Sequence, residues 1–391
     1  GASSRYAYDN PGRPIPPTLP SGQNSVTYGY DLLDRQTSAA ITGQTISLSW
    51  DALGRNTSQG DFLTGTLSYL YDAAGRRTRV TWADGFYAAY DYDNTGLMTA
   101  VRENGATSGA GVLATYIYDN LGRRTGITRG NGTSTTYSYD AISQLTGLNQ
   151  DLAGSANDLA LGFGYSPAGQ ILSRTSSNSA YIYHPTPPAS TAYVSDGLNR
   201  YSSVGGTTYT YDARRNLTSD GSRTMAYDSL NRLTSVSGPT AVTLAYDPLG
   251  RLSASTASSS TTRFQYDGVQ LATEYNTSGT IQRRYVVGDD QNEPLVWYEG
   301  SGTSDRRWLY ADNQGSIIAY ADVSGAAAAT YGYGAYGEPN AWTGARYRYT
   351  GQTVIPEANL YYYRARVYDP RIGRFFQTDP IGTSGGINLY A

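Results

Sequence analysis

Aromatic and polar positions alternate along most of this chain. Pairs of aromatic residues separated by one position, such as Tyr116/Tyr118 and Tyr137/Tyr139, stand directly before an aspartate. Residues i and i+2 share one face of a β-strand, so each pair predicts a strand with an aromatic face. The helical period of apolar positions is almost absent, and only residues 324–330 predict a brief helical segment.

The aromatic pairs belong to a repeat with a step of about twenty residues. Its unit is aromatic-x-aromatic-Asp, two or three further residues, and then Gly-Arg, Asn-Arg or a related pair. The copies stand at Tyr8-Asp9, Tyr30-Asp31, Trp50-Asp51, Tyr71-Asp72, Tyr92-Asp93, Tyr118-Asp119, Tyr139-Asp140, Tyr165-Ser166, Tyr211-Asp212, Tyr227-Asp228, Tyr246-Asp247 and Tyr266-Asp267. Two proline-rich stretches, 14–21 and 183–188, interrupt the repeat and predict loops.

Each unit predicts one β-hairpin. The aspartate can cap the turn with its carboxylate, and the glycine supplies the positive φ that the turn requires. Single hairpins are marginal in water and become stable when they stack on their neighbours. We therefore expect an all-β protein, in which tandem hairpins form one continuous antiparallel sheet. Such a sheet twists as it grows, so it winds into a spiral or hollow shell that shelters its tyrosine face and limits exposed edges.

The composition agrees with a sheet whose sheltered face is covered by tyrosine side chains. The chain of 391 residues has 38 Tyr and 45 Gly but only 6 Phe and 2 Met, and 39% of it is hydrophobic. Tyrosine buries a large ring while its hydroxyl keeps a hydrogen-bond partner. All 29 basic residues are arginines, yet the net charge is -3 with both signs interspersed. Nucleic acid, which requires a basic face, is therefore not an expected partner.

Several other classes of function are disfavoured. Without cysteine the chain has no disulfide framework, no thiol nucleophile and no thiolate metal site. The single histidine, His184, stands beside three prolines and predicts a loop residue, so no metal and no cofactor are expected. No apolar run is long enough to span a membrane, and the first residues do not have the pattern of a signal peptide. We expect a fragment whose export signals lie elsewhere.

From about Leu309 the spacing changes, and a group of specific motifs follows. They are Tyr361 to Tyr368-Asp369-Pro370, Gly373-Arg374-Phe375, Asp379-Pro380-Ile381-Gly382 and Asn388-Leu389-Tyr390. This part resembles the Rhs repeat-associated core domain at the C-terminal end of bacterial Rhs/YD-repeat proteins, including the C components of Tc toxin complexes. The sequence departs from that pattern at three positions, Asn359, Val367 and Thr383.

The resemblance implies a division into a hairpin array over residues 1–308 and a core domain over 309–391. It further implies a shell, closed by the core domain, that encloses the chain's own C-terminal passenger, commonly a toxin. It also implies a delivery or N-terminal partner component, and a secreted or cell-surface location in bacteria.

In the family that the chain resembles, the core domain is an intramolecular aspartyl protease that releases the passenger. The matching residues are Asp379 and Asp369, with Arg366 as an electrostatic partner. Two carboxylates held close together can act as base and acid on a peptide bond. Each residue also has a structural alternative: Asp369 ends another copy of the repeat, Asp379 begins an Asp-Pro turn, and Arg366 can form an ordinary ion pair. Arg366 and Tyr368 are expected on one face of a strand, with Asp369 on the other unless a turn begins there.

Three functions remain open at this point. The first is a shell that encapsulates a C-terminal toxin. The second is a structural or adhesive cell-surface scaffold without cargo or protease activity, as YD repeats are in animal receptors. The third, which ranks last, is a stand-alone self-cleaving enzyme. The bacterial-type core motifs favour the first.

Overall fold

The computed structural model describes residues 7–8, 14–15, 25–61, 63–184, 191–289 and 293–391. These residues form an all-β protein with short 3₁₀ helices, as the sequence predicts. A two-stranded ribbon pairs β1 (Ala7–Tyr8) with β2 (Pro14–Ile15), and β2 lies in the proline-rich stretch 14–21 that the sequence predicts to be a loop. The remainder of that stretch, and most of the second proline-rich stretch, lie outside the described residues.

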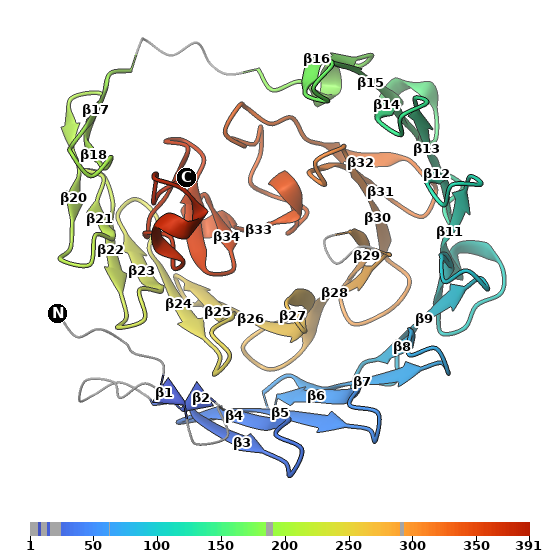
Figure 1. Cartoon of the computed structure of the whole chain (residues 1–391), viewed down its shortest axis with the longest axis horizontal. Helices are drawn as coiled ribbons and strands as arrows, with labels where there is room; N and C mark the ends of the chain where they lie inside the picture. The colour runs from blue at the N-terminus through green and yellow to red at the C-terminus, as the bar shows by residue number, and fades with distance from the viewer. Residues whose placement is uncertain (1–6, 9–13, 16–24, 62, 185–190, 290–292) are drawn as a thin grey trace.

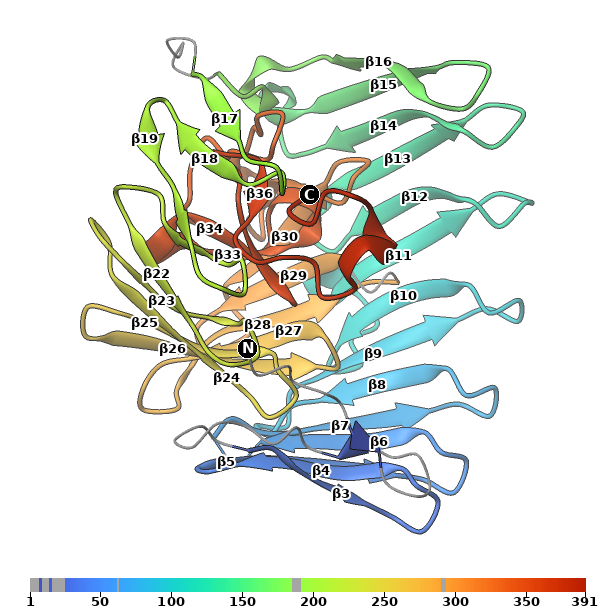
Figure 2. The same cartoon turned by 60° about the vertical axis from the view of Figure 1, so that its left-hand side comes forward.

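The first sheet holds fourteen antiparallel strands in strict chain order, stacked one above another in Figure 2. They are β3 (Thr27–Tyr30), β4 (Gln36–Ile41), β5 (Gln44–Trp50), β6 (Asn56–Asp61), β7 (Gly65–Tyr71), β8 (Arg77–Thr81), β9 (Tyr87–Tyr92), β10 (Met98–Glu103), β11 (Val112–Tyr118), β12 (Arg124–Arg129), β13 (Ser134–Tyr139), β14 (Leu145–Asp151), β15 (Leu159–Tyr165) and β16 (Ile171–Ser176).

A small sheet and a second large sheet continue the wall. The small one contains β17 (Tyr193–Ser195), β18 (Tyr201–Val204) and β19 (Thr207–Thr208). The second large sheet has thirteen strands in chain order: β20 (Thr210–Tyr211), β21 (Leu217–Ser219), β22 (Thr224–Tyr227), β23 (Leu233–Ser237), β24 (Val242–Tyr246), β25 (Leu252–Ala257), β26 (Ser260–Asp267), β27 (Gln270–Tyr275), β28 (Ile281–Val287), β29 (Pro294–Glu299), β30 (Arg306–Ala311), β31 (Ile317–Ala321) and β32 (Ala327–Thr330).

The repeat motif builds the same kind of turn in most of the hairpins. Asp119 illustrates it: Oδ1 accepts hydrogen bonds from the backbone N–H groups of Leu121 and Arg123, both at 3.0 Å. Its Oδ2 accepts from the Arg123 guanidinium at 2.7 Å. Gly122 takes the required positive φ of 75°. The aspartate therefore satisfies the turn's free N–H groups and fixes the arginine four residues later.

Tyrosine hydroxyls join each hairpin to the one before it. The tyrosine that precedes the aspartate donates to a backbone carbonyl in the preceding repeat, as Tyr139 does to Arg124 at 2.8 Å and Tyr266 to Leu252 at 2.8 Å. The arginine of one repeat lies over the tyrosine ring of the next, for example Arg123 over Tyr139 at 4.8 Å. Aromatic and charged positions of neighbouring repeats are thereby linked along the wall.

The wall winds on itself (Figure 1). β26 to β32 run inside the arc formed by the middle of the first sheet, and the C-terminal part lies innermost. Contacts between residues far apart in sequence confirm the winding: Trp308 Nε1 donates to the Leu113 carbonyl at 2.9 Å, and Trp82 Nε1 donates to Thr273 at 2.9 Å. Ile41 and Leu244 line one cavity, so the start of the first sheet lies beside the second.

Two buried clusters follow from this layering. The first lies between the two large sheets and includes Leu113, Val296 and Trp308. The second lies between the second sheet and the C-terminal part, and includes Trp297 and Leu360. Val296 belongs to the first cluster and Trp297 to the second, because successive side chains of a strand point to opposite faces. Both faces of this part of the second sheet are therefore covered.

The C-terminal part is a four-stranded antiparallel sheet: β33 (Thr353–Ile355), β34 (Leu360–Tyr363), β35 (Arg366–Asp369) and β36 (Arg374–Phe375). The 3₁₀ helices are η1 (Gly109–Gly111), η2 (Ser155–Asn157), η3 (Ser179–Tyr181), η4 (Tyr349–Gly351), η5 (Pro356–Ala358) and η6 (Gly382–Gly385). Asn359 follows η5 with φ of 54°, a left-handed conformation that asparagine tolerates better than most residues.

One local prediction is wrong. Residues 324–330 form no helix, because residues 322–325 make another repeat turn and β32 pairs with β31. The second sheet thus continues past the predicted division at 308/309 and ends at Thr330. The two-part organisation stays a prediction.

Candidate functional site

The C-terminal sheet is the candidate site, since it carries the predicted catalytic residues and lies on the inner side of the wall (Figure 1). Specific bonds fasten it there. The Tyr362 hydroxyl accepts from the Leu252 backbone N–H at 2.9 Å, and the Leu217 backbone N–H donates to the Phe376 carbonyl at 2.9 Å. Two strands of the second sheet, β21 and β25, therefore hold the C-terminal sheet.

A buried ion pair adds to this attachment. Arg346 donates to Glu274 of β27 at 2.6 Å, and both side chains are less than a tenth exposed. Burial alone would raise the pKa of Glu274, but the Arg346 guanidinium outweighs it and lowers that pKa. The carboxylate is thus kept ionised by its partner inside the wall.

Asp369 ends β35 and is completely buried. Its Oδ1 accepts from the Arg371 backbone N–H at 3.0 Å, which is the repeat's turn bond. Its Oδ2 accepts from Arg223 at 2.5 Å and from Arg371 at 2.8 Å. Both oxygens of this carboxylate therefore already have donors.

A second carboxylate shares these two arginines. Asp220, in the turn after β21, lies 2.7 Å from Arg223 and 3.2 Å from Arg371. Burial would raise the pKa of Asp220, but the charge and hydrogen bonds of Arg223 prevail and lower it to about 2. We call Asp220, Arg223, Asp369 and Arg371 the four-residue clamp. It connects the hairpin array to the C-terminal sheet.

Asp379 lies in a different environment. It pairs with Arg366 at 3.0 Å, and the Arg366 guanidinium lies 3.7 Å from the centre of the Phe375 ring. Burial lowers the pKa of Arg366, although the negative charge of Asp379 acts in the opposite direction. The backbone N–H of Asp379 donates to the Leu389 carbonyl at 2.8 Å, and Arg366 donates to the same oxygen at 3.3 Å.

The last residues are held beside this pair. The Phe375 backbone N–H donates to the Tyr390 carbonyl at 3.0 Å, so the end of the chain runs along β36. The Tyr390 side chain is only 2% exposed and its hydroxyl donates to the Arg215 carbonyl at 2.7 Å. The segment 388–391 is thus anchored on the inner side of the wall, next to Asp379.

The structure brings Arg366 and Asp379 together but places Asp369 elsewhere. Burial alternates along β35, with Arg366 and Tyr368 on one face and Val367 and Asp369 on the other. Asp369 and Asp379 therefore lie on opposite faces and bind different arginines. The catalytic role of these three residues stays a prediction.

Sequence reasoning did not find Asp220 and Arg223. Their local signal is an Asp-Gly turn with an arginine three residues after the aspartate, outside the repeat register. That signal predicts a turn, but it does not predict the partner, because Asp369 is 149 positions away from Asp220 in the sequence. Only the winding of the wall brings them together.

Within the described residues, no group of three or more His, Asp or Glu side chains is arranged to hold a metal ion. In that same part of the chain, none of the helices is long and apolar enough to cross a membrane.

Comparison with protein families decides the relationship. The profile described as Teneurin YD-shell matches residues 2–134 and 125–385. The chain belongs to the Teneurin YD-shell family. The repeat that dominates the sequence is thus the YD repeat of this family, wound into a β-shell wall.

Curated relatives are similar over short stretches. The tRNA3(Ser)-specific nuclease WapA of Bacillus spizizenii is 30% identical over 142 residues, which is 34% of this chain and 6% of that protein. Salivary gland surface protein 1 of Aedes aegypti is 46% identical over 63 residues, 15% of this chain and 2% of that protein. Double-stranded DNA deaminase toxin A of Burkholderia cenocepacia is 46% identical over 43 residues, 11% of this chain and 3% of that protein. The chain thus spans a small part of these relatives.

Solved structures share the fold over nearly the whole chain. The TcdB2-TccC3 crystal structure has a TM-score of 0.66 and 18% identity, covering 98% of this chain and 27% of that chain. The Photorhabdus luminescens Tc holotoxin pore has a TM-score of 0.65 and 17% identity, covering 98% of this chain and 26% of that one. At this identity the likeness shows the fold alone.

Proposed function

We propose that this YD-shell chain forms the C-terminal part of a bacterial toxin shell that encloses the polypeptide following it. The observation that carries the proposal is the position of residues 388–391, which are bound on the inner side of the wall. A segment continuing from Ala391 starts within the wound sheets. Relatives named as a nuclease and as a deaminase toxin support a toxic passenger.

Limited proteolysis of the full-length natural protein tests enclosure. We expect the segment after residue 391 to survive protease concentrations that digest the same segment expressed alone, because the wall excludes the protease. Equal rates of digestion in the two samples would contradict the proposal.

The shell also requires other components under this proposal. The chain covers about a quarter of the matched solved chain, and the matched structure is named for two components, TcdB2 and TccC3. We infer that further wall, a delivery partner or both complete this shell, and that the assembly acts outside the bacterial cell. Co-expression of the natural protein with the products of the neighbouring genes, followed by co-purification, tests this inference.

We further propose that the core domain cleaves its own chain. Asp379 with Arg366 is the better-placed pair, since it lies against the end of the chain. In a chain extended by its natural downstream segment, Asp379→Asn and Arg366→Gln should abolish the cut product seen by mass spectrometry. Asp369→Asn should do so as well if both carboxylates act. Asp322→Asn, in an exposed repeat turn, serves as the control. Cleavage of the Asp379→Asn variant at the wild-type rate would exclude this mechanism.

A cell-surface scaffold without cargo is the second candidate. The similarity to a salivary gland surface protein favours it. The natural gene beyond residue 391 separates the two: a short toxin-like segment followed by an immunity gene supports the shell, whereas a long stalk supports the scaffold.

A further inference from the structure

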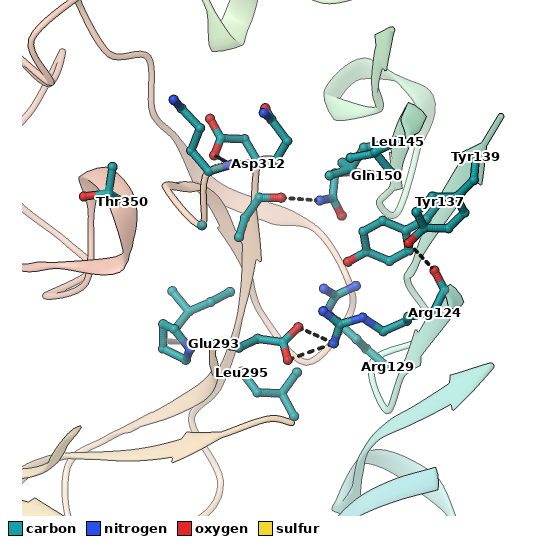
Figure 3. A pocket seen from close by; sticks show the side chains of 17 residues that line it. Arg124, Arg129, Tyr137, Tyr139, Leu145, Gln150, Glu293, Leu295, Asp312 and Thr350 are labelled. Atoms are coloured by element: carbon teal, nitrogen blue, oxygen red, sulfur yellow. Dashed lines mark hydrogen bonds and ion pairs between the residues drawn. The ribbon is translucent and has the colours of Figure 1, made fainter. Parts of the chain in front are cut away.

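A cavity of about 510 Å³ lies between the two large sheets. Residues of β12, β13 and β14 form one side, and residues around β29 and β30 form the other (Figure 3). Its lining includes the apolar residues Leu148 and Leu295 beside Tyr137. The volume is in the range of small-molecule sites, about 300–1,000 Å³.

Arg129 is the unusual member of this lining. It is 5% exposed, and its guanidinium lies over the Tyr310 ring at 4.4 Å. Within the described part of the chain, its side chain donates one hydrogen bond, from Nη1 to Thr135 Oγ1 at 2.6 Å, and its buried Nε has no partner. Among the described residues, no carboxylate lies within ion-pair distance of Arg129. A buried cation without a counter-charge is costly unless an anion accompanies it.

The other charges around the cavity are already compensated. Glu293 accepts two hydrogen bonds from Arg124, at 2.8 and 2.9 Å, as Figure 3 shows. Asp312 accepts the backbone N–H groups of Gln314 and Ser316, and Arg174 at 3.2 Å. Among the lining residues that the structure describes, Arg129 is then the cation without a paired carboxylate.

A second unsatisfied group lines the same cavity. The side-chain oxygen of Asn313 is buried without a hydrogen-bond partner among the residues that the structure describes. An unpaired buried acceptor favours a ligand that also brings a hydroxyl or amine donor. As far as the structure describes the lining, it thus combines an arginine without a paired carboxylate, an amide oxygen without a donor and an apolar surface.

We propose that this cavity binds a small molecule bearing a carboxylate or phosphate group, with the oxyanion paired to Arg129. The guanidinium offers the geometry that oxyanions favour, and the leucines accommodate the apolar part. The site is independent of cargo enclosure, because it lies between the layers of the wall and uses none of the residues assigned to cleavage.

Titration with inorganic phosphate and with acetate, at constant ionic strength, tests the site. We expect at least one of them to bind saturably at one site per chain and to raise the melting temperature at about 10 mM. Arg129→Gln should weaken that binding at least about tenfold. Arg79→Gln is the matched control, since Arg79 lies on the same sheet, is half-buried and forms no ion pair with a described carboxylate.

The outcomes separate clearly. Preference for phosphate over acetate assigns a phosphorylated ligand, and the reverse assigns a carboxylate. Direct ³¹P NMR and calorimetric titrations of the wild-type protein give the answer even if Arg129→Gln does not fold. Absence of saturable binding of both anions to the wild type, or equal binding to a folded Arg129→Gln variant, overturns the proposal.

Discussion

The aspartate of the repeat turn, as at Asp247, binds both its own turn and a neighbouring side chain. One oxygen satisfies the turn's backbone N–H groups, and the other fixes an arginine that lies over the next repeat's tyrosine. The tyrosine hydroxyl then donates to the previous repeat. Each residue of the YD motif therefore contributes both to its own hairpin and to the link between hairpins.

Asp247 tests the turn. It is 3% exposed, and its carboxylate accepts from the backbone N–H groups of Leu249 and Arg251 and from the Arg251 guanidinium. Asp247→Ala should lower the free energy of unfolding by about 3 kcal/mol, because buried donors lose their acceptor. Asp247→Asn, which keeps an acceptor for the backbone, should lose less. Urea denaturation measures both; an unchanged midpoint for Asp247→Ala would refute the role of the turn.

The hydroxyl link is tested by a matched pair of tyrosines. Tyr266 and Tyr116 are each 6% exposed, but of the two hydroxyls only that of Tyr266 has a hydrogen-bond partner among the described residues. Tyr266→Phe should cost about 1 kcal/mol of unfolding free energy, while Tyr116→Phe should be neutral or stabilising. Thermal or chemical denaturation measures the difference, and equal effects at the two positions would contradict it.

At the scale of elements, the hairpins were predictable and their long-range partners were not. The alternation of aromatic positions and the Asp-Gly turns determine strands and register locally, so Tyr118 and Tyr139 lie where the repeat predicts. The run of alanines in residues 324–330 favours a helix by intrinsic propensity. These residues form a strand instead, because β32 pairs with β31. Arg366 was correctly expected on the face opposite Asp369, but the clamp partner Asp220 depends on how the sheets wind.

The four-residue clamp fastens the C-terminal sheet to the array. Asp369→Asn removes a charge between two arginines, Arg223 and Arg371, and should destabilise the protein by about 3 kcal/mol. Differential scanning calorimetry of the variant measures this loss. A melting temperature equal to that of the wild type would show that the clamp contributes no stability.

The clamp also predicts a pH dependence. The pKa of Asp220 is about 2 in the folded chain, below the ordinary value of 3.8. A lowered carboxyl pKa contributes stability above the unfolded value and loses it as pH falls through the folded value. Stability should therefore decline between about pH 4 and pH 2, and this part of the decline should be smaller in Asp220→Asn. An identical acid profile for the variant would exclude Asp220 as its source.

At the scale of the whole molecule, winding distinguishes this chain from a simple linear repeat protein. In linear arrays each repeat contacts only its neighbours. Here Arg77 pairs with Asp267, and Arg306 pairs with Glu103, across the two layers. The sequence could predict that the tyrosine face is sheltered, but not which strand covers which, because local patterns carry no information on these pairings.

Trp308 tests the contact between layers. It is completely buried and its indole N–H donates to the Leu113 carbonyl. Trp308→Ala should cost about 3–5 kcal/mol, because it leaves a cavity between the sheets. Ile117→Ala, at a position 56% exposed on the same sheet as Leu113, should change stability by less than about 0.5 kcal/mol. Circular dichroism during urea denaturation measures both, and similar losses would contradict the layered packing.

A cryo-electron microscopy reconstruction of the full-length natural protein tests enclosure most directly. We predict a continuous β-wall that winds with its tyrosine links intact, with the segment after residue 391 as density inside the closed interior. An open sheet with that segment on the outside, or separate compact modules in place of one wall, would contradict it.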